Sequence, residues 1–154
     1  MASTQVLTRR PLSASTKLLL GFVAGFLATL LFHQPVLSLL IHLGVAKANV
    51  YSMTSTAPLG VPQVISLAFW GGVWGIVLAL IEGQFPRGAA YWICALVFGA
   101  IFPTLCAWFL VAPMKGQAMA AGWDLSRMIV GPIVNGAWGL GTALLLNLGY
   151  RVWR

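Results

Sequence analysis

Residues 69–75 read Phe69-Trp70-Gly71-Gly72-Val73-Trp74-Gly75 and lie inside an apolar run from residue 64 to residue 81. Glycines at this density let a second backbone approach closely, and a large indole beside them fills the space around the contact. Helices in lipid associate through such small residues, because no hydrophobic drive brings them together there. The stretch therefore predicts a helix that packs tightly against other helices inside a membrane.

A weaker copy of this stretch returns later in the chain. Both copies contain Gly-x-Trp-Gly, at residues 72–75 and 136–139, and an Ala-Leu pair follows each at the same distance. A fainter echo relates residues 22–25 to residues 96–99. Together they indicate a duplicated helical hairpin whose two units share one orientation, with a pseudo-axis along the membrane normal. Chance similarity between glycine-rich apolar segments is the alternative.

Composition supports the membrane class. The chain has 154 residues, of which 60% are hydrophobic and only 7% charged, whereas a soluble domain carries about 25% charged residues. The net charge of +7 does not indicate nucleic-acid binding, which needs a basic face. Here the basic residues flank the apolar runs, where they set membrane orientation.

Four apolar runs are long enough to cross a bilayer of about 30 Å as helices. We expect one all-α membrane domain over residues 1–154, a four-helix bundle preceded by a cytoplasmic tail at residues 1–16. The predicted spans are residues 18–43, 64–81, 89–111 and 128–148. Because the link between the second and third spans is brief, we expect those two helices to be antiparallel neighbours.

The first span could instead belong to a cleaved export signal, because Arg9 and Arg10 resemble a twin-arginine motif. Its apolar run continues from Leu18 nearly to Leu43, however, well beyond the 7–15 residues of a signal core. An uncleaved first span is the better interpretation.

The distribution of Lys and Arg predicts the orientation. Six lie on one side (Arg9, Arg10, Lys17, Arg87, Arg151 and Arg154) and three on the other (Lys47, Lys115 and Arg127). We therefore expect both termini and the link at residues 82–88 to be cytoplasmic, in a bacterial inner membrane. The loop at residues 44–63 then faces outward, and it contains no recognisable site motif.

Catalytic chemistry has few candidates. The only acids, Glu82 and Asp124, fall on opposite faces in this topology, so they cannot form a paired-carboxylate site, and neither lies near His33. Cys94 and Cys106 are about 18 Å apart along one helix, too far for a disulfide. We therefore expect no enzyme activity, no cofactor and no metal site.

His33 and Gln34 are the first candidate ligand-binding residues, because polar groups inside a span are functional hypotheses by default. A haem would need two facing histidines, but His33 and His42 lie about 13 Å apart on opposite helix faces. A haem shared with another chain, or a quinone contact, stays open. The structural alternative is that both residues bond backbone groups freed by Pro35.

Asn135 is the third candidate. It lies in a line with Gly131 and Gly139, which is typical of a helix contact face, and a buried amide stabilises such a contact by about 0.6–2 kcal/mol. Structural use is therefore favoured over substrate binding. The predicted helix-packing residues are Gly21, Gly25, Gly71, Gly72, Gly75, Trp74, Gly131, Gly136, Trp138 and Gly139.

Residues 21–35 and 60–75 resemble segments of small four-span bacterial inner-membrane proteins of unassigned function. The resemblance implies a four-span architecture and supplies no functional residues.

The small-residue faces on spans one, two and four exceed what one bundle obviously needs. The sequence therefore predicts a non-catalytic accessory or assembly subunit that packs, within the lipid bilayer, against other membrane protein subunits. The alternatives are a small transporter or channel built as a homo-oligomer, and a haem- or quinone-binding anchor of a redox complex.

Overall fold

The computed structural model describes residues 12–57 and 59–153 and is almost entirely helical. The predicted all-α fold is confirmed. Within the described residues, four helical stretches are long and apolar enough to cross a membrane: Ala14–His42, Gln63–Gln84, Ala89–Met114 and Leu125–Val152. Most of the tail, including Arg9 and Arg10, and the terminal Arg154 lie outside the described residues.

The first stretch consists of α1 (Ala14–Ala28), the π-helical turn η1 (Thr29–His33) and α2 (Gln34–His42). The second consists of α3 (Gln63–Ile81) and the 3₁₀ turn η2 (Glu82–Gln84). The third contains α4 (Ala89–Cys106), the π turn η3 (Ala107–Val111) and α5 (Ala112–Met114). The last contains α6 (Leu125–Met128) and α7 (Val130–Val152), and it follows the 3₁₀ segment η4 (Met119–Trp123).

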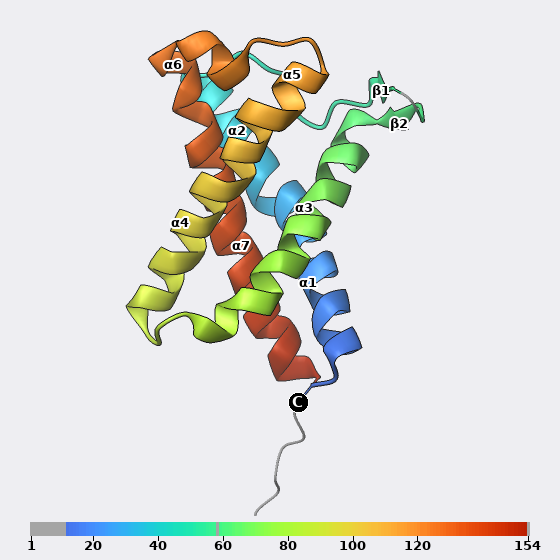
Figure 1. The fold of residues 1–154 in the computed structure, drawn as a ribbon, viewed down its shortest axis with the longest axis vertical. Helices are drawn as coiled ribbons and strands as arrows, with labels where there is room; N and C mark the ends of the chain where they lie inside the picture. The colour runs from blue at the N-terminus through green and yellow to red at the C-terminus, as the bar shows by residue number, and fades with distance from the viewer. Residues whose placement is uncertain (1–11, 58, 154) are drawn as a thin grey trace, which may run out of the picture.

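The only strands in the described part of the chain form a small antiparallel hairpin in the loop before α3. In it, β1 (Ser55–Thr56) pairs with β2 (Val61–Pro62), with Ser55 opposite Pro62. We call this end of the molecule, which also holds residues 115–124, the loop end. We call the opposite end, where α3 and α4 are linked and α7 finishes, the link end (Figure 1).

Both π turns precede a proline by two positions. η1 is followed by Gln34 and Pro35, and η3 by Ala112 and Pro113. In a π turn a carbonyl bonds the N–H five residues on, and a proline has no N–H to offer. The first stretch nevertheless stays helical through Pro35 to His42. Widening the turn is therefore how this helix accommodates its proline without breaking.

The four stretches form two close pairs, α1 with α3 and α4 with α7, and α1 packing on α7 joins the pairs. α3 and α4 make little contact with each other, and in Figure 1 their ribbons stand apart over most of their length. The two helices are antiparallel, as expected from the brief link, but they are neighbours over only a small part of their length. A short link fixes only the adjoining helix ends, whereas the glycine faces decide where backbones approach closely.

The close pairs are built on glycine-to-glycine contacts. A Cβ added to Gly25 would lie 2.8 Å from the Cα of Gly75, and one added to Gly75 would lie 2.8 Å from the Cα of Gly25. In the other pair, a Cβ on Gly99 would lie 2.8 Å from the Cα of Gly139. No side chain fits at these four positions without moving a backbone.

The two glycine crossings match position for position. Added Cβ atoms at Gly25 and Gly75 would meet the carbonyl oxygens of Gly71 and Gly21. At Gly99 and Gly139 they would meet those of Asn135 and Ala95, which are the counterparts in the sequence repeat. Gly99 was not among the predicted packing residues, although it aligns with Gly25.

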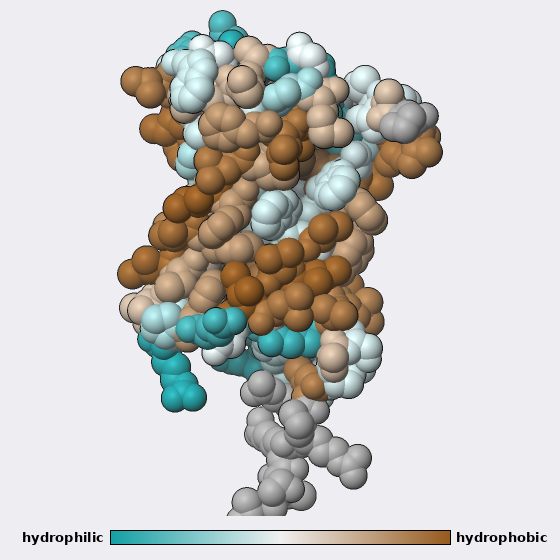
Figure 2. Space-filling model, in the orientation of Figure 1, coloured by the Kyte–Doolittle hydropathy of each residue, from teal (hydrophilic) through white to brown (hydrophobic). Residues whose placement is uncertain are grey.

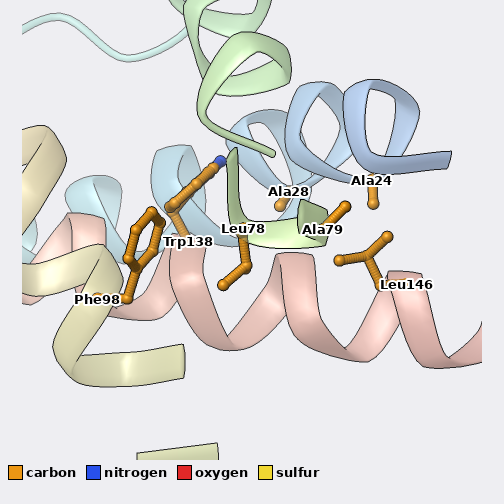
Figure 3. Close-up of a cluster of buried hydrophobic side chains, with 7 residues drawn as sticks. All are labelled: Ala24, Ala28, Leu78, Ala79, Phe98, Trp138 and Leu146. Atoms are coloured by element: carbon orange, nitrogen blue, oxygen red, sulfur yellow. The ribbon is translucent and has the colours of Figure 1, made fainter. Parts of the chain in front are cut away.

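The core lies where α1, α3, α4 and α7 meet. Figure 3 shows seven buried side chains from these helices turned toward one another: Ala24, Ala28, Leu78, Ala79, Phe98, Trp138 and Leu146. Around this core, the surface seen in Figure 2 is a broad hydrophobic band, with the hydrophilic residues gathered at the two ends. This division is the one a membrane-spanning bundle requires.

Candidate functional site

Gln34 is buried, with 3% of its surface exposed, and faces the loop that precedes α3. Its Oε1 accepts a hydrogen bond from the backbone N–H of Tyr51 at 2.8 Å. Its Nε2 lies 3.5 Å from Nδ1 of its neighbour His33. The side chains of His33 and Gln34 thus lie together, and the Gln34 side-chain carbonyl is hydrogen-bonded to the loop that precedes α3.

Tyr51 completes this attachment. Its hydroxyl donates to the carbonyl oxygen of Leu30 at 2.7 Å, which is the carbonyl that would bond the missing N–H of Pro35. Its backbone has a φ of 49°, in the left-handed region, which is uncommon for a residue with a large side chain. The loop is therefore bonded to the first helix at its proline, where a carbonyl had no partner within the π turn.

Asn135 and Gly131 lie on the predicted contact face, between α7 and the third stretch. The Asn135 side-chain N–H₂ donates to Oγ1 of Thr104 at 2.9 Å. A Cβ added to Gly131 would lie 3.0 Å from the methyl group of Thr104. This arrangement is a hydrogen bond across two helices of the kind expected for a buried amide.

The tryptophans of the two Gly-x-Trp-Gly copies each reach across to the other helix pair. Trp138 on α7 donates its indole N–H to the carbonyl oxygen of Gly25 on α1 at 2.9 Å. Trp74 on α3 meets Phe98 on α4 edge-to-face, with ring centroids 6.0 Å apart. The repeated tryptophan therefore connects the two pairs in both directions.

Gly72 and Gly136 are less tightly enclosed than the crossing glycines. A Cβ added to Gly72 would lie 2.6–3.0 Å from the ring of Phe22, a side chain. One added to Gly136 would lie 3.5 Å from the Cβ of Ala100, an ordinary contact. Both positions face a neighbouring helix, and Gly136 has room for a methyl group.

A third polar cluster, which the sequence did not predict, lies at the link end. Glu82 is only 8% exposed, and its Oε2 accepts a hydrogen bond from the Tyr91 hydroxyl at 2.5 Å. Asn147 on α7 donates to the Tyr91 oxygen at 3.0 Å and to the Ala143 carbonyl oxygen at 2.8 Å. Three helical stretches thus contribute to one hydrogen-bonded chain around a buried carboxyl group.

This cluster borders a cavity of about 380 Å³. Its wall carries the aromatic rings of Phe85, Tyr91 and Trp92 beside Glu82 and Asn147. The ring centroids of Phe85 and Tyr91 are 6.0 Å apart, and those of Tyr91 and Trp92 are 5.3 Å apart. An acidic group among aromatic rings is the arrangement proteins use for cations, so we treat this cavity as the candidate functional site.

The sequence placed Glu82 in the cytoplasmic link at residues 82–88, because the apolar run ends at Ile81. In the structure, η2 continues α3 by one more turn and folds Glu82 inward. One signal was available in the sequence. Glu82 lies at the end of the second span, and Tyr91 and Asn147 lie near the ends of two other spans on the same side. Asn147 also lies within the predicted fourth span, near its end.

A second cavity, of about 590 Å³, lies at the loop end beside Trp108, Gln117 and Arg127. Near it, Ala120, Ala121 and Trp123 have left-handed φ values of 47°, 55° and 61°. Backbone in this region is strained for residues with a side chain. The lining offers one cationic group and no acid.

Asp124 begins α6 at the same end. Its Oδ1 accepts from the hydroxyl of Ser126 at 2.6 Å and from the Ser126 backbone N–H at 3.0 Å. These bonds favour the ionised carboxylate, so they lower the pKa of Asp124 below its usual value. The group is fully exposed and acts as a helix cap.

Within residues 12–57 and 59–153, no three His, Cys, Asp or Glu side chains come close enough together to hold a metal ion. Comparisons with protein-family models, characterised proteins and solved structures found no match to this chain.

Proposed function

We propose that the chain is a multi-pass membrane protein without catalytic activity that acts as an accessory or assembly subunit. In this proposal, a transmembrane helix of another membrane protein packs against the open face between α3 and α4. The supporting observation is that the two helix pairs are closed together along α1 and α7 but splay apart along α3 and α4.

The divergence can be followed along the aromatic residues of the two helices. Trp74 and Phe98 are in contact, and Phe98 is only 5% exposed. One helical turn nearer the loop end, on the same faces, Trp70 is 58% exposed and Phe102 is 52% exposed. A helix seated there would cover both rings, and aromatic side chains are enriched at such contacts between proteins.

The glycine faces do not support the proposal. Added Cβ atoms at Gly21, Gly25, Gly71, Gly75, Gly131 and Gly139 would all lie within 3.0 Å of atoms of this chain. The premise that these faces exceed the needs of one bundle is therefore wrong, because the bundle uses them internally. The open α3–α4 face takes their place as the surface available to a partner.

The proposed location is a bacterial inner membrane with the link end and both termini in the cytoplasm, on the basis of the Lys and Arg distribution. Single cysteines in a background lacking Cys94 and Cys106 test the orientation with an impermeant thiol reagent on intact cells. We expect labelling at position 55, in β1, and none at position 84, in η2. The reverse pattern would invert the proposed topology.

A photoreactive amino acid at position 70 or 102 tests the docking face in intact cells. We expect ultraviolet light to give a discrete adduct heavier than the chain by the mass of another membrane protein. The matched control is position 144 on α7, where Leu144 is also exposed within a span. Adducts at twice the chain mass would favour the homo-oligomeric alternative, and adducts with lipid alone at positions 70 and 102 would contradict the accessory role.

A further inference from the structure

We infer that the link-end cavity is a binding site for an alkylammonium group, seated beside the Glu82 carboxylate. The inference is independent of the accessory role, because it concerns the opposite end of the α3–α4 face. It begins from the carboxyl group itself. Glu82 is one of two acids in the chain, and it is folded into the bundle although its neighbours Gly83 and Gln84 are exposed.

A buried carboxylate needs compensation by charge or hydrogen bonds. Tyr91 donates one hydrogen bond, to Oε2. The Asn147 side-chain N–H₂ donates to the Tyr91 oxygen and to the Ala143 carbonyl oxygen. Within the described residues, no Lys or Arg side chain forms an ion pair with Glu82. Glu82 therefore places at the cavity wall a hydrogen-bond acceptor that no cationic side chain of the described residues occupies.

The cavity walls suit a cation. Phe85, Tyr91 and Trp92 line this open cavity together with Glu82, and aromatic faces attract ammonium groups through the ring quadrupole. The volume of about 380 Å³ falls within the roughly 300–1,000 Å³ of small-molecule sites. A carboxylate and three rings together recognise an organic ammonium better than they would recognise a bare metal ion, which needs several oxygen ligands.

Arg87 indicates which molecule carries the ammonium group. Its exposed side chain also lines the cavity, and a guanidinium pairs well with phosphate oxygens. The site lies where two apolar stretches end, Gln63–Gln84 and Ala89–Met114, which is the depth of lipid headgroups in the proposed membrane. A phosphoethanolamine headgroup, with ammonium at Glu82 and phosphate at Arg87, fits this arrangement, and a free alkylamine shares the ammonium half.

Native mass spectrometry of the purified full chain tests the lipid source. The protein in mild detergent receives equal amounts of phosphatidylethanolamine and phosphatidylglycerol with the same acyl chains. We expect retained phosphatidylethanolamine to exceed phosphatidylglycerol by at least about tenfold, because losing one partner of a buried charge pair weakens binding by that much or more. Glu82→Gln, which keeps an acceptor for Tyr91, should abolish the preference, and Asp124→Asn should preserve it.

A second arm uses ethylammonium chloride and measures thermal unfolding in detergent, with sodium chloride as the matched salt. Stabilisation of the wild type but not of Glu82→Gln, without any lipid preference, would assign the site to a free amine. Arg87→Gln should weaken phosphatidylethanolamine retention while leaving the ethylammonium effect unchanged.

If wild type and Glu82→Gln behave alike in both arms, the inference is overturned. Circular dichroism checks that Glu82→Gln remains folded. Should that variant not fold, Trp92→Leu decides the question, because it removes a cavity wall and leaves the Glu82–Tyr91 bond in place. Unchanged binding of both ligands by Trp92→Leu would equally overturn the inference.

Discussion

Two seams join the helix pairs: the α1–α7 seam, where α1 packs on α7, and the α3–α4 seam, where α3 faces α4. They occupy equivalent places in the repeat, yet the helices are in contact along the first seam and apart along most of the second. On α7, Gly141 receives the ring of Phe32, and Gly149 receives Leu20, whose Cδ2 would lie 3.1 Å from an added Cβ. By the repeat alignment, the counterparts of these glycines are Val77 and Phe85. The closed seam therefore has two recesses that the open seam lacks.

The side chains that fill the recesses differ as well. Phe32 and Leu20 of the first stretch align with Cys106 and Cys94 of the third. The open seam thus has the reverse arrangement: the larger residues are Val77 on α3 and Phe85 just after η2, and the smaller ones are on α4. The comparison teaches that the shared glycine crossings determine the two helix pairs, whereas a few positions outside the crossings determine which seam closes.

The largest loss of stability should come from substitutions at the glycine crossings, which both helix pairs share. Gly75→Ala and Gly139→Ala each place a methyl group against backbone, so we expect each to lower the free energy of unfolding by about 3 kcal/mol, the upper part of the range for overpacking. Unfolding in mixed detergent micelles measures this. Gly136→Ala is the control, because its methyl group would lie 3.5 Å from Ala100. Tolerance of alanine at only one crossing would show that the pairs are not built alike.

The next largest loss of stability should come from a substitution that gives the α1–α7 seam a residue of the α3–α4 seam. Gly141→Val would force the Phe32 ring out of its recess. We expect a loss of about 1–2 kcal/mol, smaller than at the crossings because a side chain rather than backbone must move. The same unfolding assay measures it, with Val77→Ala on the half-exposed face of α3 as the comparison. An equal loss in Val77→Ala would contradict the proposed difference between the seams.

A smaller effect should distinguish the two tryptophans that connect the pairs. Trp138→Phe removes the bond to the Gly25 carbonyl, which still accepts from the Thr29 hydroxyl at 3.0 Å. We therefore expect a loss of about 1 kcal/mol, that of one net hydrogen bond. Trp74→Phe retains a ring against Phe98 and should cost less. Thermal unfolding of both variants tests the order, and the reverse order would show that the ring contact holds the pairs together.

The smallest change in stability should come from substituting Asp124, which lies in neither seam. Because hydrogen bonds from Ser126 lower its pKa, the carboxylate stabilises the folded state above its usual pKa. That stabilisation is lost as the pH falls through the lowered value. We expect Asp124→Asn to reduce the difference in melting temperature between neutral and acidic detergent solutions slightly. A large shift would mean that α6 supports the bundle.

The sequence predicted the helices well, because the length of an apolar run sets the length of a spanning helix. The small-residue face of the first span and the Gly-x-Trp-Gly repeat also identified Gly25, Gly75 and Gly139 as packing residues, since close approach of helices in lipid demands small side chains. It did not show that Gly75 would meet Gly25, because contacts between distant spans depend on how the helices cross.

The candidate site was harder to predict, for a local reason. The position of Glu82 depends on one added turn after Ile81, and helix ends are where patterns of hydropathy are least informative. Asn147 and Tyr91 read as ordinary span-end residues until the fold places them beside that carboxyl group. Tyr51 was equally hidden, since its contact with Leu30 joins a loop to a helix 21 residues earlier.

The bond from Tyr51 to Leu30 has a consequence for how the chain is made. Until residue 51 has been synthesised, the first helix carries a backbone carbonyl with no donor, and such a group is costly inside a bilayer. The side-chain oxygen of the buried Gln34 likewise lacks this donor until the Tyr51 N–H is present. During co-translational insertion the first span is therefore complete only once the following loop has emerged, so its final seating occurs together with the entry of α3.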